Sequence, residues 1–115
     1  VIGRRYIREI TNPLFTMQSH PENTDPVFHL FVVTVEDPDD LIAYMNGKGM
    51  ECNKHYPVPC HLQKAYAHLG YKEGDCPNAE HLAGHCVTLP LFPEMTDEEV
   101  TMVIDACNRY KGKAR

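Results

Sequence analysis

Two side chains that can donate hydrogen bonds, His55 and Tyr56, stand immediately before two prolines in the run HYPVPCHLQKAYAHLGY of residues 55–71. Pro57 and Pro59 restrict the backbone there, so the turn has little conformational freedom left to lose. Polar side chains held at fixed angles on such a turn are suited to a binding surface. The alternative is a packing corner that directs Tyr56 into the protein's own core. The residues alone favour neither interpretation.

Histidines and cysteines are numerous enough to raise the question of a metal site. The candidate ligands are Cys52, His55, Cys60 and His61, with His81, His85 and Cys86 further along the chain. Structural zinc sites usually contain a tight pair such as C-x-x-C, and the one close match here is Cys52-x-x-His55. The prolines restrict how that pair could close with Cys60. We therefore expect no metal site and interpret these side chains as surface or core residues.

Other classes of chemistry find little support. Neither a GxGxxG nor a GxxxxGK[ST] phosphate loop is present. The net charge is −5, whereas nucleic-acid binding needs clustered positive charge. The two basic clusters, Arg4-Arg5-Arg8 and Lys111-Lys113-Arg115, are interpreted as solvated faces or tails. No apolar run approaches the roughly 20 residues that span a bilayer, so we expect neither nucleic acid nor a membrane as a partner.

The cysteines indicate the compartment. They number five, and their spacing follows no disulfide-scaffold rhythm. We interpret them as reduced thiols in a cytoplasmic protein.

The hydrophobic pattern predicts an α/β fold, a short sheet flanked by helices. Residues 27–35 (VFHLFVVTV) are predicted as a strand covered on both faces, and 50–54 and 87–92 as weaker strands. Helices are predicted at 2–10, from Asp37-Pro38 to Gly47 or Gly49, at 62–69, at 79–86 and after the capping box Thr96-Asp-Glu-Glu99. The last three should bury the stripes Leu62/Ala65/Tyr66/Leu69, Ala79/Leu82/Ala83/Cys86 and Val100/Val103/Ile104/Cys107.

Several segments together resemble one known family. The run HYPVPCHLQKAYAHLGYKEGD, then A-E-x-L-A and TLPLFPEMTDEEV, is similar to the C-terminal part of the DegT/DnrJ/StrS family. The segments VFHLFVVTVED and DPDDLIAYMNGKG match the family pattern in order and spacing. The resemblance covers residues 27–107. Its members are pyridoxal-phosphate-dependent aminotransferases that act on nucleotide-linked keto-sugars.

The resemblance implies a fold, a cofactor and partners. The chain would be the single small C-terminal domain, residues 1–115, of a fold-type I aminotransferase, and a piece of a longer chain in which residues 1–10 end an interdomain helix. The longer parent would use pyridoxal 5'-phosphate, take its amino group from a donor such as glutamate, and form a homodimer. His55, Tyr56 and Pro57 would lie at the nucleotide-sugar site. No lysine here matches the Schiff-base motif, so we expect no catalytic residue and no cofactor in this chain alone.

A rival function from another class is a non-catalytic regulatory or binding domain of the same fold, since fold does not determine function. The residue at the Schiff-base lysine position of the large domain would separate the two.

The odd cysteine count predicts a measurable outcome. Thiol titration of the denatured, unreduced protein should find about five thiols per chain. A value of about one or three would mean disulfides and would contradict the cytoplasmic assignment.

Overall fold

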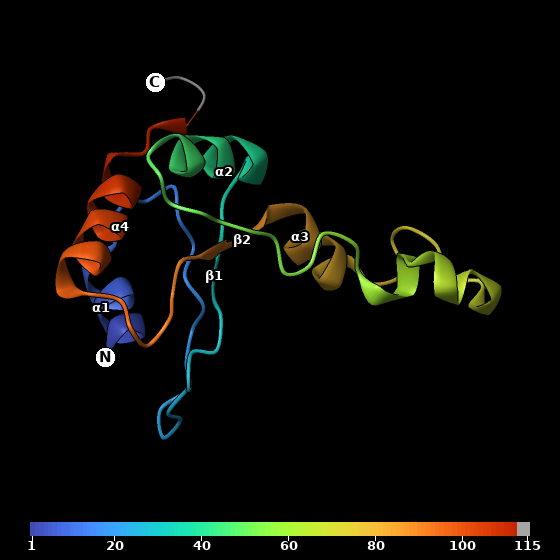
Figure 1. Cartoon of the computed structure of the whole chain (residues 1–115). Helices are drawn as coiled ribbons and strands as arrows, with labels where there is room; N and C mark the ends of the chain where they lie inside the picture. Colours follow the sequence, from blue (N-terminus) through green and yellow to red (C-terminus); the bar gives the residue numbers. More distant parts are fainter. Residues whose placement is uncertain (113–115) are drawn as a thin grey trace.

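The computed structural model describes residues 1–112 and shows a rounded body from which one arm extends (Figure 1). Lys113 and Arg115 of the C-terminal basic cluster lie outside the described residues. The body contains α1 (Ile2–Glu9), β1 (Phe31–Thr34), α2 (Pro38–Gly47), β2 (Cys86–Leu89) and α4 (Asp97–Arg109). The arm contains two short 3-10 helices, η1 (Cys60–Leu62) and η2 (Lys64–Leu69), and is joined back to the body by α3 (Pro77–His85).

A two-stranded antiparallel sheet lies at the centre of the body. β1 pairs with β2 in the register Phe31↔Leu89 to Thr34↔Cys86. Single bridges extend the sheet on both sides, from Thr34 to Thr16 and from Thr88 to Asn53. All four residues of β2 are buried. The predicted α/β class, a short sheet flanked by helices, is confirmed.

Helices α2 and α4 begin at the caps that their sequences predict. The Asp37 carboxylate accepts from the Asp40 amide at 3.1 Å, with Pro38 in the first turn. The Thr96 hydroxyl accepts from the Glu99 amide at 3.1 Å, and the Glu99 carboxylate accepts from the Thr96 amide at 3.3 Å, which completes the capping box. The predicted stripe of α4 is confirmed, with Val100, Val103, Ile104 and Cys107 all buried.

The long strand predicted at 27–35 is wrong in length and in burial. β1 covers only 31–34, and its side chains alternate between buried and half-buried, while Val27 is 91% exposed. Phe28 has a φ of +53°, a left-handed conformation that a strand cannot contain. The chain therefore turns before β1 begins. The strand predicted at 50–54 reaches the edge of the sheet but forms only the Asn53–Thr88 bridge.

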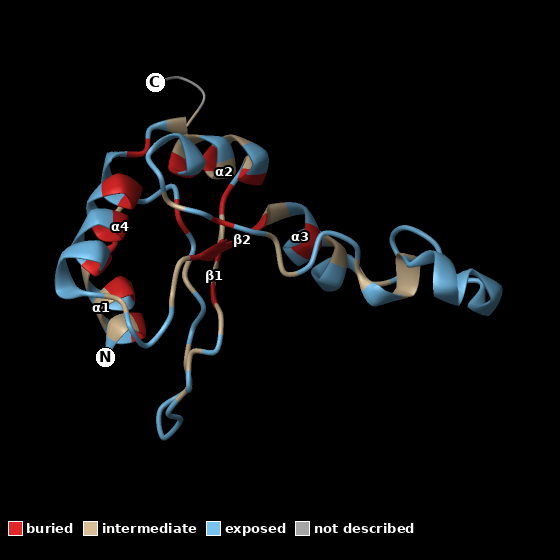
Figure 2. Ribbon diagram, viewed as in Figure 1, coloured by how far each residue is buried: buried red, intermediate tan, exposed pale blue. Residues whose placement is uncertain are grey.

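The amphipathic helix predicted at 62–69 is also wrong. The segment forms 3-10 turns with no buried residue, and Tyr66 and Leu69 are about half exposed (Figure 2). An apolar stripe stabilises a helix only where it packs against another surface, and the arm meets none within residues 1–112. Gly70 does end the segment in a left-handed conformation, as predicted. Of the stripe predicted at 79–86, Ala83 and Cys86 are buried, although Cys86 is the first residue of β2 and not part of α3, while Ala79 and Leu82 are exposed.

The predicted free thiols are confirmed for all five cysteines. Burial raises the pKa of Cys52 to about 12 and raises the pKa of Cys107 as well. Both thiols therefore behave as small apolar groups at neutral pH. Within residues 1–112, no helix has the length and apolar character that crossing a bilayer requires.

Two helical glycines predict opposite effects of one substitution. A Cβ on Gly3 of α1 would lie 2.5 Å from the ring of Phe28, whereas a Cβ on Gly84 of α3 would meet nothing within 4 Å. Helix propensity alone favours alanine over glycine by about 1 kcal/mol. We expect Gly84→Ala to stabilise by roughly that amount, and Gly3→Ala to destabilise by roughly 1 to 3 kcal/mol, because the Phe28 ring must move.

Denaturant unfolding of the two variants beside the parent sequence measures both effects. Stabilisation by Gly3→Ala would show that Phe28 does not pack against α1.

Candidate functional site

The predicted His-Tyr turn lies where the chain leaves the sheet and enters the arm. Asn53 is the last residue bridged to β2, and His55 then lies against Thr88 of the same strand, with His55 Nδ1 2.7 Å from the Thr88 hydroxyl. Thr88 is 7% exposed. The His55–Tyr56 peptide is cis, and the two rings pack edge to face at 5.1 Å. The buried strand thus determines where the turn begins.

Tyr56 faces solvent. It is 68% exposed, and no hydrogen bond joins its hydroxyl to any other residue of the described chain. The alternative in which the turn directs Tyr56 into its own core is therefore wrong for this structure. The hydroxyl is available to donate to a ligand or to accept from one.

Two open hollows border this turn. One, of about 530 Å³, is lined by Tyr56, Pro57, Val58, Leu62, Gln63 and Lys64. The other, of about 420 Å³, lies between the turn and α3; its lining includes His55, Tyr56, Val58, Ala79, Leu82 and Ala83. His55 and Tyr56 therefore share one hollow, and Tyr56 and Pro57 share the other. Combined apolar walls and a few polar groups are the usual composition of a small-molecule site.

Sequence reasoning missed Thr88, which holds His55 in place. Its signal was a single hydroxyl within the apolar run CVTLPLF, because a buried polar side chain requires a partner. Sequence reasoning also interpreted Leu82 as a core residue. The structure leaves this side chain 47% exposed at the second hollow.

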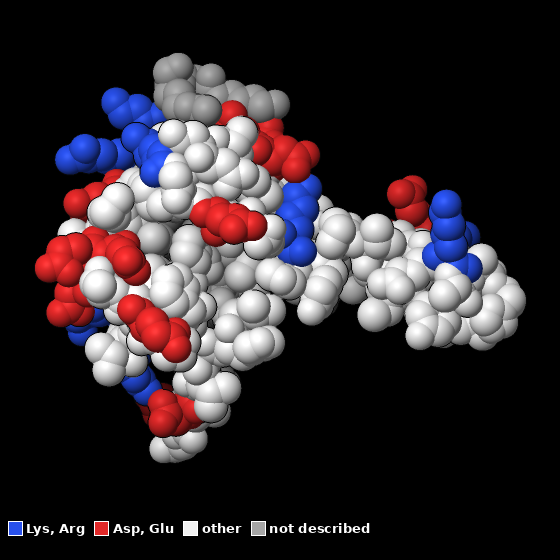
Figure 3. All heavy atoms as spheres, viewed as in Figure 1, with Lys and Arg blue, Asp and Glu red and all other residues white. Residues whose placement is uncertain are grey.

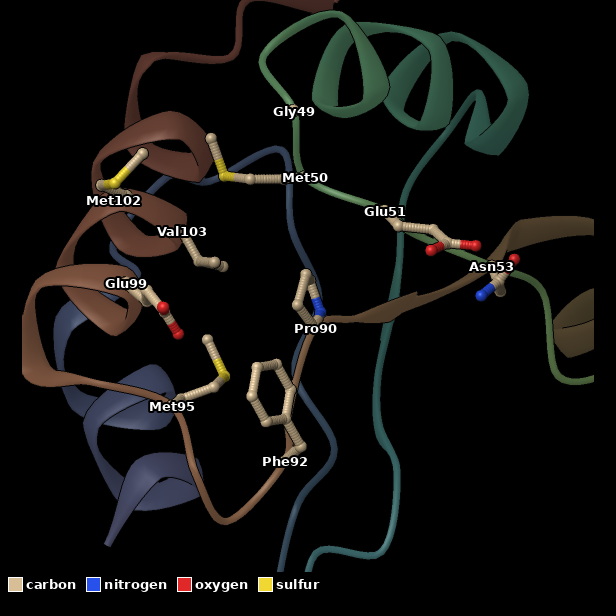
Figure 4. A pocket seen from close by; sticks show the side chains of 10 residues that line it. All are labelled: Gly49, Met50, Glu51, Asn53, Pro90, Phe92, Met95, Glu99, Met102 and Val103. Carbon is tan, nitrogen blue, oxygen red and sulfur yellow. The ribbon is translucent and has the colours of Figure 1, made fainter.

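A third hollow, of about 490 Å³, lies on the opposite part of the body between α4 and the segments at 49–53 and 90–95 (Figure 4). Met50, Met95, Met102 and Phe92 make its walls largely apolar. The carboxylate of Glu99 also borders it but already serves the capping box. None of the predicted site residues reaches this hollow.

The metal candidates are engaged in other contacts. His55 contacts Thr88, and Cys52 is only 3% exposed. The rings of His81 and His85 stack at 4.1 Å, and His85 Nδ1 donates to the carbonyl oxygen of His81 at 2.7 Å. Among residues 1–112, no three His, Cys, Asp or Glu side chains gather as a metal site requires.

The described lysines do not fit a Schiff-base anchor for pyridoxal 5'-phosphate. Such a lysine is usually desolvated beside the cofactor. Lys54 pairs with Asp39 at 2.7 Å, Lys72 pairs with Asp75 at 3.0 Å, and Lys48 lies over the Tyr44 ring. The two remaining lysines of the described chain, Lys64 and Lys111, are exposed. Of these five lysines, only Lys64 lines one of the hollows described above, and that hollow is open to solvent, so no step of a reaction is assigned to the cofactor in this chain.

The sequence matches the profile of one family. Residues 2–108 match the profile of the DegT/DnrJ/EryC1/StrS aminotransferase family. The chain belongs to this family.

Individual relatives give a finer comparison. The chain is 40% identical over 88 residues to the dTDP-3-amino-3,4,6-trideoxy-alpha-D-glucose transaminase of Streptomyces venezuelae, covering 76% of this chain and 23% of that enzyme. It is 34% identical over 101 residues to a pleiotropic regulatory protein of Geobacillus stearothermophilus, covering 88% and 27%. Its fold is similar to the crystal structure of S. venezuelae DesV in complex with a ketimine intermediate. The TM-score is 0.89 at 34% identity, over 93% of this chain and 29% of that one.

The lysine contacts predict the behaviour of the chain with added cofactor. We expect no stable Schiff-base absorbance band when pyridoxal 5'-phosphate is added, because exposed or paired lysines bind aldehydes weakly and reversibly. The visible spectrum before and after borohydride reduction, with mass analysis, is the measurement. A stable band that reduction converts to one labelled lysine would contradict the prediction.

Proposed function

We propose that this chain is the small C-terminal domain of a pyridoxal-phosphate-dependent aminotransferase that passes an amino group from a donor such as glutamate to a nucleotide-linked keto-sugar. The chain spans only 23–30% of the length of the curated relatives named for sugar transamination, so the cofactor and its lysine are assigned to the remainder. Residues 1–10 would end the helix that joins the two domains. The observation that carries the proposal is the exposed Tyr56 hydroxyl on the His-Tyr-Pro turn, in a chain of this family.

The chemistry of the turn suits a sugar. Tyr56 can both donate and accept one hydrogen bond, as can a sugar hydroxyl. His55 uses Nδ1 with Thr88, which leaves Nε2 for a substrate in either tautomer. Pro57 restricts the backbone directly after Tyr56 and so limits the entropy lost on binding. In this proposal His55 and Tyr56 orient the sugar, and the cofactor held elsewhere supplies the amino-transfer chemistry.

The same proposal implies the partners, the compartment and the oligomeric state of the full-length protein. Its partners would be a nucleotide-sugar and the amino donor, without nucleic acid or membrane, and it would be a cytoplasmic homodimer. The free cysteines support a reducing compartment. The net charge of −5 supports a partner other than nucleic acid.

A regulatory function is the second candidate, because one relative is named as a pleiotropic regulatory protein. The large domain separates the two functions. A lysine positioned for the cofactor supports the aminotransferase, and another residue at that position supports the regulatory alternative.

Tyr56→Phe in the full-length protein tests the proposed site. The change removes one hydroxyl and retains the ring. Loss of one hydrogen bond to a neutral partner should cost about 0.5 to 1.5 kcal/mol, which is up to roughly a tenfold fall in kcat/KM for the keto-sugar. The free energy of unfolding should not change, because the hydroxyl bonds to no described residue.

Tyr66→Phe is the matched control, since Tyr66 is 46% exposed on the same arm but borders neither hollow. Both variants should unfold like the parent, and only Tyr56→Phe should lose activity. A loss of stability with unchanged kcat/KM would remove Tyr56 from the site.

A further inference from the structure

The arm keeps its shape without a hydrophobic core of its own. No residue of η1 or η2 is buried, and most of the larger apolar side chains of the arm and α3 are exposed: Tyr56, Val58, Tyr66, Leu69, Tyr71 and Leu82. Figure 2 shows the outer arm almost entirely in the exposed colour. Figure 3 shows few charged side chains on the face of the arm that is in view. Polar contacts must therefore hold its segments together.

One carboxylate makes most of those contacts. Glu80, in the first turn of α3, accepts from the amide of Gly74 at 2.8 and 3.1 Å and from the amide of Cys76 at 3.0 Å. His61 Nε2 lies 3.2 Å from the same carboxylate. A carboxylate with three N–H partners from two chain segments ties the 70–76 loop and η1 to one helix.

The surroundings of Glu80 favour the ionised form of its carboxylate. The hydrogen bond from the Gly74 amide, followed by the one from Cys76, holds the pKa of Glu80 below its usual range. Its position near the N-terminus of α3 also favours a negative charge. Glu80 is therefore ionised at neutral pH and accepts hydrogen bonds only, so the His61 nitrogen that faces it must carry a proton.

His61 connects the Glu80 carboxylate to the segment that carries the His-Tyr turn. Its side chain is only 8% exposed, and its ring packs edge to face on Tyr71 at 6.2 Å. His61 directly follows Cys60, and only the short segment 57–60 separates it from Tyr56. A displacement of η1 would therefore displace the turn.

The hollow shared by His55 and Tyr56 lies between the parts that Glu80 joins. One wall is the turn and η1, including Cys60 and His61. The facing wall is α3, with Ala79 and Leu82 on either side of Glu80 in sequence, and Cys76 completes it. The width of this hollow thus depends on how firmly η1 is held against α3.

We infer that Glu80 is a positioning residue for the sugar subsite, acting through His61 and the amides of Gly74 and Cys76 to hold the wall that carries Tyr56. This inference rests on the proposed function. Glu80 itself contacts no substrate. Its loss acts on the binding of the keto-sugar and leaves the reaction with the amino donor unchanged.

Glu80→Gln in the full-length, cofactor-loaded protein tests the inference. The amide side chain keeps the size but loses the charge and one acceptor. KM for the nucleotide-linked keto-sugar should rise by roughly tenfold, because small displacements of binding groups are costly. The single-turnover rate with the amino donor alone should stay within experimental error of the parent. Glu73→Gln, which removes an exposed carboxylate from the same loop, is the matched control and should change neither quantity.

Hydrogen exchange of the same proteins gives a readout that does not need turnover. The amides of Gly74 and Cys76 should exchange slowly in the parent and in Glu73→Gln, and faster in Glu80→Gln. If the unsubstituted full-length protein transaminates no keto-sugar, the proposed function fails. The exchange result still shows whether Glu80 holds the amides of Gly74 and Cys76. If Glu80→Gln does not fold, His61→Phe decides the matter, because it keeps the ring on Tyr71 and should raise the same KM.

Three results would overturn the inference. They are a KM for Glu80→Gln equal to that of Glu73→Gln, an equal loss in both half-reactions, or unchanged exchange at both amides.

Discussion

The contact of Thr88 with the segment 53–55 is the constraint on which the arrangement of the molecule depends. Thr88 exchanges two backbone hydrogen bonds with Asn53 and places its hydroxyl 2.7 Å from His55. Its strand is buried at every residue, so it cannot shift without opening the core. The chain therefore leaves the body at one point and in one direction, and the stability of the core is transmitted to the turn that carries Tyr56.

Body and arm are stabilised by different physics. The body buries residues from α1, α2, α4 and both strands in one cluster, and Tyr6 and Leu41 are completely enclosed. The arm relies on polar contacts, chiefly the hydrogen bonds to the partly buried Glu80 carboxylate, together with the exposed ion pair of Lys72 with Asp75. An exposed ion pair contributes little to stability, because solvent competes for its charges. Regions with few buried apolar contacts open most easily. The exposed aromatic and aliphatic side chains of the arm would gain stability against another surface, and the remaining length of the relatives is large enough to contain one.

Sequence patterns predicted the elements whose signals are local. The caps at Asp37 and Thr96 and the stripe of α4 depend on residues three or four positions apart, and all were correct. The long strand failed because nothing in its apolar run reveals the positive φ of Phe28. The helix at 62–69 failed because its apolar stripe was interpreted as buried, whereas no residue of η1 or η2 is buried in the described chain. At the site, prolines and polar residues marked the turn, but Thr88 and Glu80 act across 33 and 19 residues of sequence, a distance that periodicity cannot reveal.

Under the proposed function, the groups that bind the sugar lie apart from the cofactor, and this separation has a consequence for specificity. Groups that act only on the sugar alter the binding of one substrate and leave the chemistry of the cofactor unchanged. We infer that His55 and Tyr56 are positioned by β2 on one side and, through η1, by Glu80 on the other. No lysine lines the hollow that these two residues share, whereas Lys64 lines the second hollow beside Tyr56. Substitutions in the turn, in η1 or along the exposed face of α3 can therefore reshape the hollow while the body, with its buried sheet, stays intact. Under the proposed function, such substitutions would change which sugar is accepted without changing how the amino group is transferred.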